Sequence, residues 1–432
     1  MEKGMICNSR QFRLITLLIA LAVSIMGNEL GNTAYAESGT RILDLPTDRV
    51  VLKLYLVNAT GEKKSVDPPM GKIIVPPSTT TEAVLLPAAL SDLSFLEKLP
   101  ANAFDHLIVR TNLNFIGDYI GLLGFWESMF RRTDDSHSAA YQHLKCLRGL
   151  TQLQQLTLMR TGISDCTLQN LQGMHNLRVL DLSANDNIRG SGLGVLRTMP
   201  HLKTLNLHLT YINDNSLSNL QGLQELQELD LSHTYIYGHG LKYLGNLRNL
   251  RKINLNSDPN IRGPGLESLA TIPALRELNL GCTYWGKPCS IDDSGTIYLA
   301  QLTQLKSLDL SGNKITDKGL KNLFRLKHLE NLNLGGTKIG DESIGFLKKF
   351  PQLKSLHLGG TKITVAALPE LGQLKRLQEL WVTATEISSS ELASLRKALP
   401  NCKIIGRGDE MDMTPVLPYF RKYNLPVPKI KY

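Results

Sequence analysis

Side chains able to carry out nucleophilic catalysis lie near the middle of this chain. His208 is followed 24 residues later by Ser232, and Asp230 stands two positions before that serine. A histidine can take the proton of a neighbouring serine hydroxyl while a carboxylate orients the imidazole. His208 and Asp230, together with His233, also offer the ligand types of a metal site. These residues are the first candidates for chemistry.

The 24 residues between His208 and Ser232 correspond to the period of a sequence repeat. The strands and helices of this repeat must position these side chains. From Leu153 onward the chain repeats Leu-x-x-Leu-x-Leu-x-x-Thr/Asn-x-Ile, a polar turn, and Leu-x-x-Leu-x-x-Leu. The first half alternates like a half-buried strand and the second half has helical spacing, with Asp317 placed to cap one such helix. Ten copies follow at intervals of 24 or 25 residues, with one of 30, and their first leucines are Leu153, Leu177, Leu202, Leu226, Leu250, Leu275, Leu305, Leu329, Leu353 and Leu377.

This pattern resembles the leucine-rich repeat across residues 153 to about 405. The segment Ile315 to Leu320 is similar to the 24-residue repeats of bacterial proteins, notably secreted ones, and residues 399–404 are similar to their closing half-repeat. The resemblance implies an α/β solenoid shaped as a horseshoe, with a concave parallel sheet, convex short helices and a core formed by stacking of neighbouring coils. It also implies a binding module.

A buried polar ladder is expected where each strand turns. Thr or Asn occupies the same position in nine copies, and its side chain can satisfy backbone groups that the turn leaves unpaired. Asp258 breaks this pattern. The ladder residues are Thr161, Asn185, Thr210, Thr234, Thr283, Asn313, Thr337, Thr361 and Thr385.

Catalysis is not expected once this frame is in place. The sequence has no Gly-rich phosphate loop, His-Glu-x-x-His, Cys-x-x-Cys or Gly-x-Ser-x-Gly motif. A flat sheet offers His208 and Ser232 no oxyanion donors, because its amides pair the strands. Neighbouring side chains on a solvated sheet need not converge on a metal. We predict no enzyme activity, no cofactor and no metal site.

Two stripes on the rim are the candidates for partner binding. The residue after the ladder position is tyrosine at Tyr211, Tyr235 and Tyr284, then lysine at Lys314, Lys338 and Lys362, and finally Glu386. Aromatic area beside positive charge suits a protein partner or an acidic glycan, although exposed rim positions can also vary without function.

The concave face adds His357 and Trp381 at equivalent positions of the last two full repeats. An outward-facing Trp381 either anchors a partner or seats the C-terminal tail. The remaining residues of that row are small and polar, and they can accept a partner without specifying one: Asp181, Asn206, Asp230, Asn254, Asn279, Asp309 and Asn333.

Cysteines flank the longest departure from the repeat. Cys282 and Cys289 bound a loop that contains Tyr284 and Trp285, and in an exported protein a disulfide between them would hold this aromatic pair, a further partner-binding candidate. Two free thiols are the alternative. Cys146 and Cys166 can also pair, and Cys402 would then be left over.

Residues 1–36 have the features of a signal peptide. A positive segment precedes the apolar run Leu14 to Gly27, and Ala34-Tyr35-Ala36 forms a cleavage site; an uncleaved anchor is the alternative. We expect a secreted, periplasmic or cell-envelope protein without a membrane span after signal removal. Residues 37–110 form an N-terminal β and cap region, and residues 111–150 an insertion with a first degenerate repeat. The ten repeats occupy 151–405, and 406–432 is a proline-containing tail.

Composition agrees with a globular binding protein. The chain has 432 residues, 42% apolar residues and a net charge of +9, a mild excess that favours anionic surfaces without indicating nucleic acid. We therefore predict protein–protein interaction through the concave sheet and the tyrosine and lysine rim. The alternatives are a cell-envelope adhesin or acidic-glycan-binding protein, and a structural envelope component.

Overall fold

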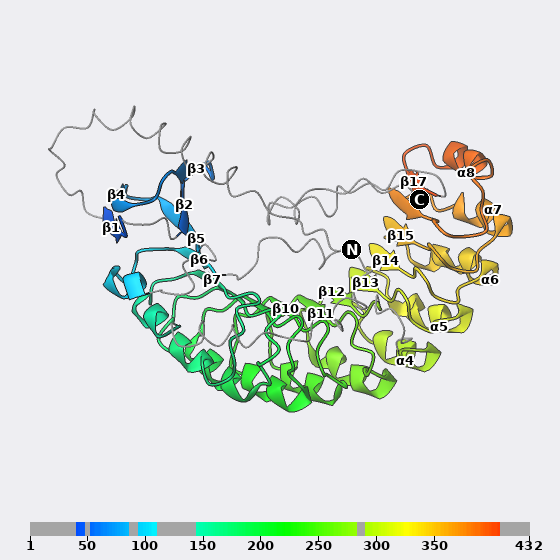
Figure 1. Ribbon diagram of the computed structural model, residues 1–432. Helices are drawn as coiled ribbons and strands as arrows, with labels where there is room; N and C mark the ends of the chain where they lie inside the picture. The colour runs from blue at the N-terminus through cyan, green and yellow to red at the C-terminus, as the bar shows by residue number, and fades with distance from the viewer. Residues whose placement is uncertain (1–39, 48–51, 86–93, 110–143, 283–289, 407–432) are drawn as a thin grey trace, which may run out of the picture.

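A computed structural model of the chain describes residues 40–47, 52–85, 94–109, 144–282 and 290–406. These residues form a succession of coils that runs from left to right in Figure 1, with the strands lining the inner side of an arc and helices α4 to α8 on its outer side. The predictions for residues 1–36, for most of the insertion at 111–150 and for the tail fall outside the described residues. Among the residues described, no helix is long and apolar enough to cross a membrane.

Each repeat contributes one three-residue strand to a single long sheet. The strands are parallel from β5 to β17, and sequence neighbours pair in register, so that Leu308 of one strand lies beside Leu332 of the next. The strands are β6 (His106–Ile108), β7 (Gln155–Thr157), β8 (Val179–Asp181), β9 (Thr204–Asn206), β10 (Glu228–Asp230), β11 (Lys252–Asn254), β12 (Glu277–Asn279), β13 (Ser307–Asp309), β14 (Asn331–Asn333), β15 (Ser355–His357), β16 (Glu379–Trp381) and β17 (Lys403–Ile405).

The outer side of the coils is built from short helical turns. In the earlier coils these turns are 3₁₀ helices: η2 (Ser94–Lys98), η5 (Leu144–Gly149), η6 (Leu168–Leu171), η7 (Ser191–Thr198), η8 (Asp214–Leu220), η9 (His239–Leu244) and η10 (Gly263–Thr271). Later coils contain α4 (Asp293–Leu299), α5 (Asp317–Asn322), α6 (Asp341–Ile344), α7 (Leu368–Leu371) and α8 (Leu392–Ala398), with the 3₁₀ turns η11 (Leu323–Arg325), η12 (Gly345–Lys349) and η13 (Val365–Ala367). The predicted convex helical segments are therefore present, although many of them are 3₁₀ helices instead of α-helices.

The core lies between the sheet and these turns and is made almost entirely of the repeated leucines. Leu308, Leu310 and Leu320, which come from the strand, the turn and the helix of one coil, are all fully buried or nearly so. The buried residues form one continuous cluster along the solenoid. No coil encloses its own leucines, so stability comes from contact with the adjacent coils.

The predicted ladder is confirmed at the described positions. The Thr210 hydroxyl donates to the Leu207 carbonyl at 2.7 Å, and the Asn185 amide donates to the Leu158 and Leu182 carbonyls at 2.8 Å. Because Leu158 belongs to the preceding coil, the asparagine also joins two coils. Every described ladder residue is buried.

Aspartates at the start of the convex turns make a second connection between coils. Asp214 accepts three backbone N–H groups of the next coil, from Tyr237, Gly238 and Gly240, at 2.6 to 3.1 Å. Asp317 likewise accepts from the Gly340 N–H at 3.0 Å, while the capping residue of its own helix α5 is Thr316. The predicted capping role of Asp317 is wrong: its carboxylate bridges to the following coil, because the turn of that coil presents an unpaired N–H to it.

The N-terminal region extends the long sheet with antiparallel strands. β5 (Thr80–Leu85) pairs with β6 on one side and with β2 (Leu52–Val57) on the other, and β3 (Lys63–Val66) forms the edge. β1 (Arg41–Leu45) and β4 (Gly71–Val75) form a separate two-stranded sheet. The predicted N-terminal β region therefore contains strands of two different sheets, and β5 continues the parallel register of the repeats.

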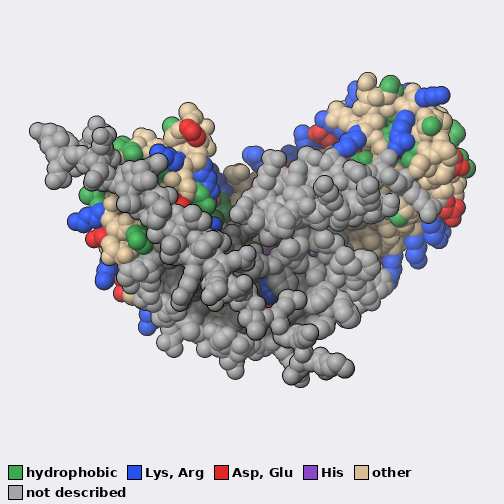
Figure 2. Space-filling model, turned by 45° about the horizontal axis from the view of Figure 1, so that its top comes forward, with side chains coloured by type: hydrophobic (Ala, Val, Ile, Leu, Met, Phe, Trp, Pro, Cys, Tyr) green, Lys and Arg blue, Asp and Glu red, His purple; other side chains and the backbone are tan. Residues whose placement is uncertain are grey.

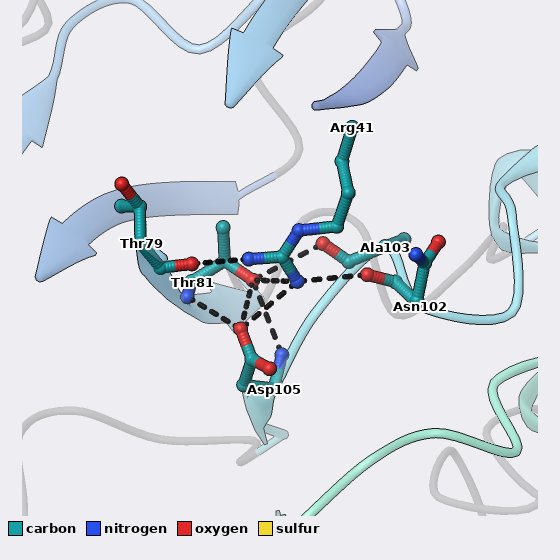
Figure 3. A network of polar contacts seen from close by, with 6 residues as sticks. All are labelled: Arg41, Thr79, Thr81, Asn102, Ala103 and Asp105. Atoms are coloured by element: carbon teal, nitrogen blue, oxygen red, sulfur yellow. Dashed lines mark hydrogen bonds and ion pairs between the residues drawn. The ribbon is translucent and has the colours of Figure 1, made fainter. Parts of the chain in front are cut away.

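A polar network attaches β1 to the first strands of the long sheet (Figure 3). The Arg41 guanidinium forms an ion pair with Asp105 at 2.9 Å and also donates to the carbonyls of Thr79 and Asn102. Asp105 accepts from the Thr81 N–H and hydroxyl at 2.8 and 3.0 Å. Breaking a largely buried pair leaves an uncompensated charge, so this network favours one fixed position of β1.

Candidate partner-binding surface

The polar row along the concave face is occupied by bonds within the chain. Asp230 Oδ1 accepts the Ser232 N–H at 2.9 Å, and Asp309 Oδ1 accepts the Ser311 N–H at 2.8 Å. The asparagine of the next coil then donates to the second carboxylate oxygen, as Asn333 does to Asp309 at 2.8 Å. These side chains form hydrogen bonds at the ends of the strands. They are therefore less available to a partner than the sequence suggested.

The rim positions are fixed by the backbone. The N–H groups of Tyr211 and Tyr235 donate to the Ile188 and Ile212 carbonyls at 2.9 Å, each in the preceding coil. The N–H groups of the rim lysines make the same bond, at 2.8 to 2.9 Å, in Lys314, Lys338 and Lys362. One rim residue per coil is therefore set at the interstrand spacing of about 4.8 Å.

The tyrosine stripe begins as a pair of stacked rings. The centroids of Tyr211 and Tyr235 are 4.8 Å apart with an angle of 28° between the ring planes, and Arg189 lies 5.6 Å from the centroid of Tyr211. Tyr235 is 41% exposed and its neighbour Tyr237 is 52% exposed. Tyr284 and Trp285 lie outside the described residues, so the third member of the stripe stays a prediction.

Bulky residues with positive φ stand beside this pair and were missed by the sequence analysis. Leu209 and His233 have φ of 54° and 55°, at the turn position that Gly336 and Gly360 occupy in later coils. Arg160, Ala184, Ser257 and Ala384 also have positive φ at this position, so a left-handed residue is a regular feature of the turn, and Leu209 and His233 are bulky residues in it. The only signal in the sequence is Leu or His where later repeats have glycine.

The two histidines of this patch interact with each other. The rings of His208 and His233 meet edge to face, with centroids 5.3 Å apart. Burial, and secondarily the proximity of His208, lowers the pKa of His233 to about 4, so its imidazole is neutral at pH 7. At pH 7 His233 thus adds an uncharged ring to the patch, beside the tyrosines and the Arg189 guanidinium.

The catalytic interpretation of these residues does not fit their hydrogen bonds. His208 Nδ1 lies 2.8 Å from the Ser232 hydroxyl, which itself donates to Asp230. With its proton directed to the carboxylate, the serine accepts from the imidazole instead of transferring a proton to it, and Asp230 does not orient His208. Within the described part of the chain, no group of three His, Cys, Asp or Glu residues is arranged to hold a metal.

The lysine stripe lies along the rim of three successive coils. Lys314, Lys338 and Lys362 are exposed, and none of them forms an ion pair with a described residue. Figure 2 shows Lys and Arg side chains on the arm of the arc that carries the C-terminal coils. Glu386, at the same position of the last full repeat, is also exposed.

His357 and Trp381 form the aromatic part of the concave face near its C-terminal end. Their ring centroids are 5.5 Å apart. A Cβ atom added to Gly335 would lie 2.4 Å from His357 Nδ1, so the imidazole occupies the space that this glycine leaves. Nδ1 is buried without a hydrogen-bond partner, and burial lowers the pKa of His357.

The cysteine predictions have mixed outcomes. Cys146 and Cys166 do not pair with each other, because both remain thiols, and Cys146 Sγ lies 3.4 Å from Glu97 Oε1. Cys402 is also a thiol, and burial raises its pKa to about 11. Cys289 lies outside the described residues, so the bond between Cys282 and Cys289 stays a prediction.

Comparison with known proteins supports the interpretation of the repeat. The leucine-rich repeat family pattern matches residues 173–196, 301–324 and 325–347. No match was found among curated proteins.

Several solved structures are similar to part of this chain, at low sequence identity. An internalin (InlF) of Listeria monocytogenes is 22% identical over 72% of this chain and 82% of that chain, with a TM-score of 0.49. TLR13 in a complex with ssRNA13 is 21% identical over 72% of this chain and 42% of that chain, with a TM-score of 0.47. Mouse RP105 in a complex with MD-1 is 24% identical over 57% of this chain and 40% of that chain, with a TM-score of 0.43.

Proposed function

We propose that this chain, whose residues 173–196, 301–324 and 325–347 match the leucine-rich repeat pattern, is an exported binding module that recognises a protein partner through its concave sheet and its tyrosine and lysine rim. A solenoid displays a long surface on which each coil offers exchangeable side chains at fixed spacing. The backbone bonds of the rim and the inward bonds of the concave row keep that surface rigid, so little conformational entropy is lost on binding.

One observation carries this proposal: the stacked pair of Tyr211 and Tyr235 next to the bulky residues Leu209 and His233. Tyr, Trp and Arg are the residue types that contribute most to protein interfaces, and they contribute most where they cluster. We place the centre of the interface on this patch, with Lys314, Lys338, Lys362, His357 and Trp381 as its outer contacts.

The compartment follows from residues 1–36, whose signal-peptide features support secretion or a place in the cell envelope. In that compartment a Cys282–Cys289 bond would persist and would hold Tyr284 and Trp285 on the same rim. The role is non-enzymatic, since the polar groups His208, Asp230 and Ser232 are bonded as a strand-end network.

The test uses a partner captured by the exported protein and cross-linked to it. Replacing Tyr211 and Tyr235 by Ala should weaken the complex at least tenfold in Kd, because both ring faces are lost. The matched control, with Phe at both positions, keeps the stack and should bind within a few fold of the parent. Equal binding by all three proteins, or cross-links confined to the convex turns, would refute the proposal.

A second candidate is a cell-envelope adhesin or acidic-glycan-binding protein, and the unpaired lysine row favours it. A purely structural envelope component, the third, predicts that no soluble partner is recovered under any condition. An enzyme contained in 116–138 or 411–432 would lose its activity when that segment is deleted, whereas the binding module has no such activity to lose.

A further inference from the structure

The lysine row of the rim consists of Lys314, Lys338 and Lys362, in three successive coils. We propose that this row also binds an acidic polysaccharide of the polyuronate type, whose carboxylates lie along the three ammonium groups. The inference rests on the proposal that the rim is a recognition surface, and it adds the chemical class of a second ligand. It concerns the later coils, away from the tyrosine pair.

Other rows of the same sheet neutralise their lysines within the protein. The Glu330 carboxylate forms ion pairs with Lys306 Nζ at 3.0 Å and with Lys354 Nζ at 2.6 Å. One acidic residue therefore lies between two basic residues of the neighbouring coils. Lys252 faces Glu277 in the next coil at 3.6 Å. On the helical side, Lys321 faces Glu342 at 3.0 Å and Lys348 faces Glu370 at 2.8 Å.

The rim row has no such compensation among the described residues, although its register is equally regular. Each lysine N–H is bonded to the preceding coil, at Ile291, Ile315 and Ile339. Three like charges are thus held about one interstrand spacing apart, roughly 4.8 Å at the backbone. Like charges at this spacing repel each other, and an external polyanion would remove the repulsion.

Glycines keep the approach to the row open. Gly336 and Gly360, at φ of 67° and 68°, stand two positions before Lys338 and Lys362, and a Cβ at either would lie no closer than 3.6 Å to its nearest neighbour. Glycine adopts this positive φ without strain, and it leaves bare backbone between the lysines and the concave face. A broad polymer such as a chain of pyranose rings can lie against it.

An extended acidic peptide is a poorer occupant of this site. Such peptides gain affinity by pairing with free main-chain groups, yet the N–H groups of Gly336 and Gly360 already donate to Gly359 and Thr383 at 2.7 and 2.8 Å. Carboxylates on one side of an extended peptide repeat at about 6.8 Å, which is longer than the backbone spacing of roughly 4.8 Å between neighbouring lysines of the row. Single-stranded nucleic acid would need aromatic platforms beside the cations, where this rim has glycine.

The experiment measures binding of the purified full chain to immobilised polygalacturonate between about 0.05 and 0.2 M NaCl, a range over which added salt increasingly screens exposed charges. The test variant carries Lys314→Ala, Lys338→Ala and Lys362→Ala. The matched control carries Lys252→Ala, Lys306→Ala and Lys354→Ala, which changes the net charge equally but removes paired lysines. Dextran and poly-L-glutamate serve as the neutral polymer and the acidic polypeptide.

The expected result is salt-dependent binding to polygalacturonate that falls at least tenfold in the rim variant and less than about threefold in the control. The slope of log K against log salt should become shallower by about two, as expected for three lost contacts with a single-stranded polyanion. Equal losses in both variants would mean that only net charge matters and would overturn the proposal. Tighter binding to poly-L-glutamate, binding to dextran, or no binding to polygalacturonate would overturn it as well.

Binding to polygalacturonate tests the lysine row separately from the tyrosine pair. Replacing Tyr211 and Tyr235 by Ala should leave binding to polygalacturonate unchanged, and urea unfolding verifies that each variant is folded. If the tyrosine variants bind every captured protein as well as the parent does, while the parent still binds polygalacturonate, only the protein-partner proposal is refuted. If the tyrosine variants lose a captured protein, while the parent does not bind polygalacturonate, only the polysaccharide proposal is refuted.

Discussion

Asp258 occupies the ladder position that is Thr or Asn in the other repeats. Its Oδ1 accepts the Thr234 N–H at 2.6 Å and the Thr234 hydroxyl at 3.3 Å, whereas Oδ2 is buried without a hydrogen-bond partner. Burial raises the pKa of this carboxyl well above its ordinary value of 3.8. An ionised carboxylate there lacks the solvation that it has in the unfolded chain.

Stability should therefore depend on the protonation of Asp258. The folded protein binds this proton more tightly than the unfolded chain does, so its contribution to the free energy of unfolding is largest below pH 3.8 and decreases as pH rises. Asp258→Asn should raise the free energy of unfolding at pH 7 by about 1–2 kcal/mol, because an amide is neutral and can donate as Asn185 does. Urea unfolding from pH 4 to pH 7.5, about the span of this titration, measures both effects; a lower stability of the variant with an unchanged pH slope would contradict them.

His233 gives a pH dependence of the opposite sign. Its pKa is lowered to about 4 by burial and, second, by His208, so below its ordinary value of 6.5 the unfolded chain binds the extra proton and the folded state does not. The free energy of unfolding should then fall as pH drops from 6.5 toward about 4, by an amount of order 3 kcal/mol when complete.

The test of this titration is His233→Asn, which keeps a residue that tolerates positive φ. Relative to the parent, the variant should lose less stability between pH 7 and pH 4.5, about the window below the ordinary histidine pKa. His239→Asn, at an exposed position of the same coil, is the control and should follow the parent. A variant that loses as much stability as the parent on acidification would show that His233 is not the group responsible.

At the scale of elements, neighbouring coils are joined by polar groups that the leucine pattern does not specify. Asp214, at the start of η8, accepts three N–H groups of the next coil, and Asp165, Asp293, Asp317 and Asp341 make similar contacts. Charge-assisted bonds of this kind are about twice as strong as neutral ones. They keep the short convex turns, which have few hydrogen bonds of their own, in register.

Asp214→Ala should lower the free energy of unfolding by about 1–2 kcal/mol, because three N–H groups, two of them half-buried, lose their acceptor. Asp214→Asn retains one carbonyl oxygen and should lie between this variant and the parent. Asp186→Ala removes an exposed aspartate of a neighbouring coil and should change stability by less than about 0.5 kcal/mol. Chemical denaturation of the three variants measures the effect; equal losses for Asp214→Ala and Asp186→Ala would disprove the bridging role.

At the scale of the whole molecule, each coil contacts its neighbours and the sheet has no central core. Removing residues 330–353 deletes one complete period and joins Leu329 to Lys354, which restores the sequence found at Leu353 and Lys354. The remaining coils should stack in register, so this variant should fold with a shorter sheet. Removing only 330–341 breaks the period and should expose leucines of the following coil.

Circular dichroism and urea unfolding distinguish these outcomes. The full-period deletion should keep a cooperative transition, with a loss of a few kcal/mol at most, while the half-period deletion should have no native transition or should aggregate. If both deletions behaved alike, the register would not be what holds the molecule together.

Much of the fold follows from the leucine positions because the interactions that determine it are local and periodic. The interval between Leu308 and Leu332 places them side by side in β13 and β14, and the intervening polar turn places the helix opposite. The same reasoning located the ladder and the rim. It failed for the N-terminal strands, since β1 and β4 pair with each other through no repeated pattern, and it gave no indication of the Arg41–Asp105 ion pair.

The sequence by itself determined the number of coils, their register and which residues face the core, because a coil in a solenoid needs only its neighbours and the neighbours repeat the same pattern. The tertiary structure decided which side chains of adjacent coils touch. It stacked Tyr211 on Tyr235, directed the Ser232 proton to Asp230, and left the lysine row without an acid while Glu330 neutralised two other lysines. The repeat period sets the position of each Cα atom in its coil. The contacts of the side chain depend on its rotamer, on the backbone φ and on the neighbouring residues.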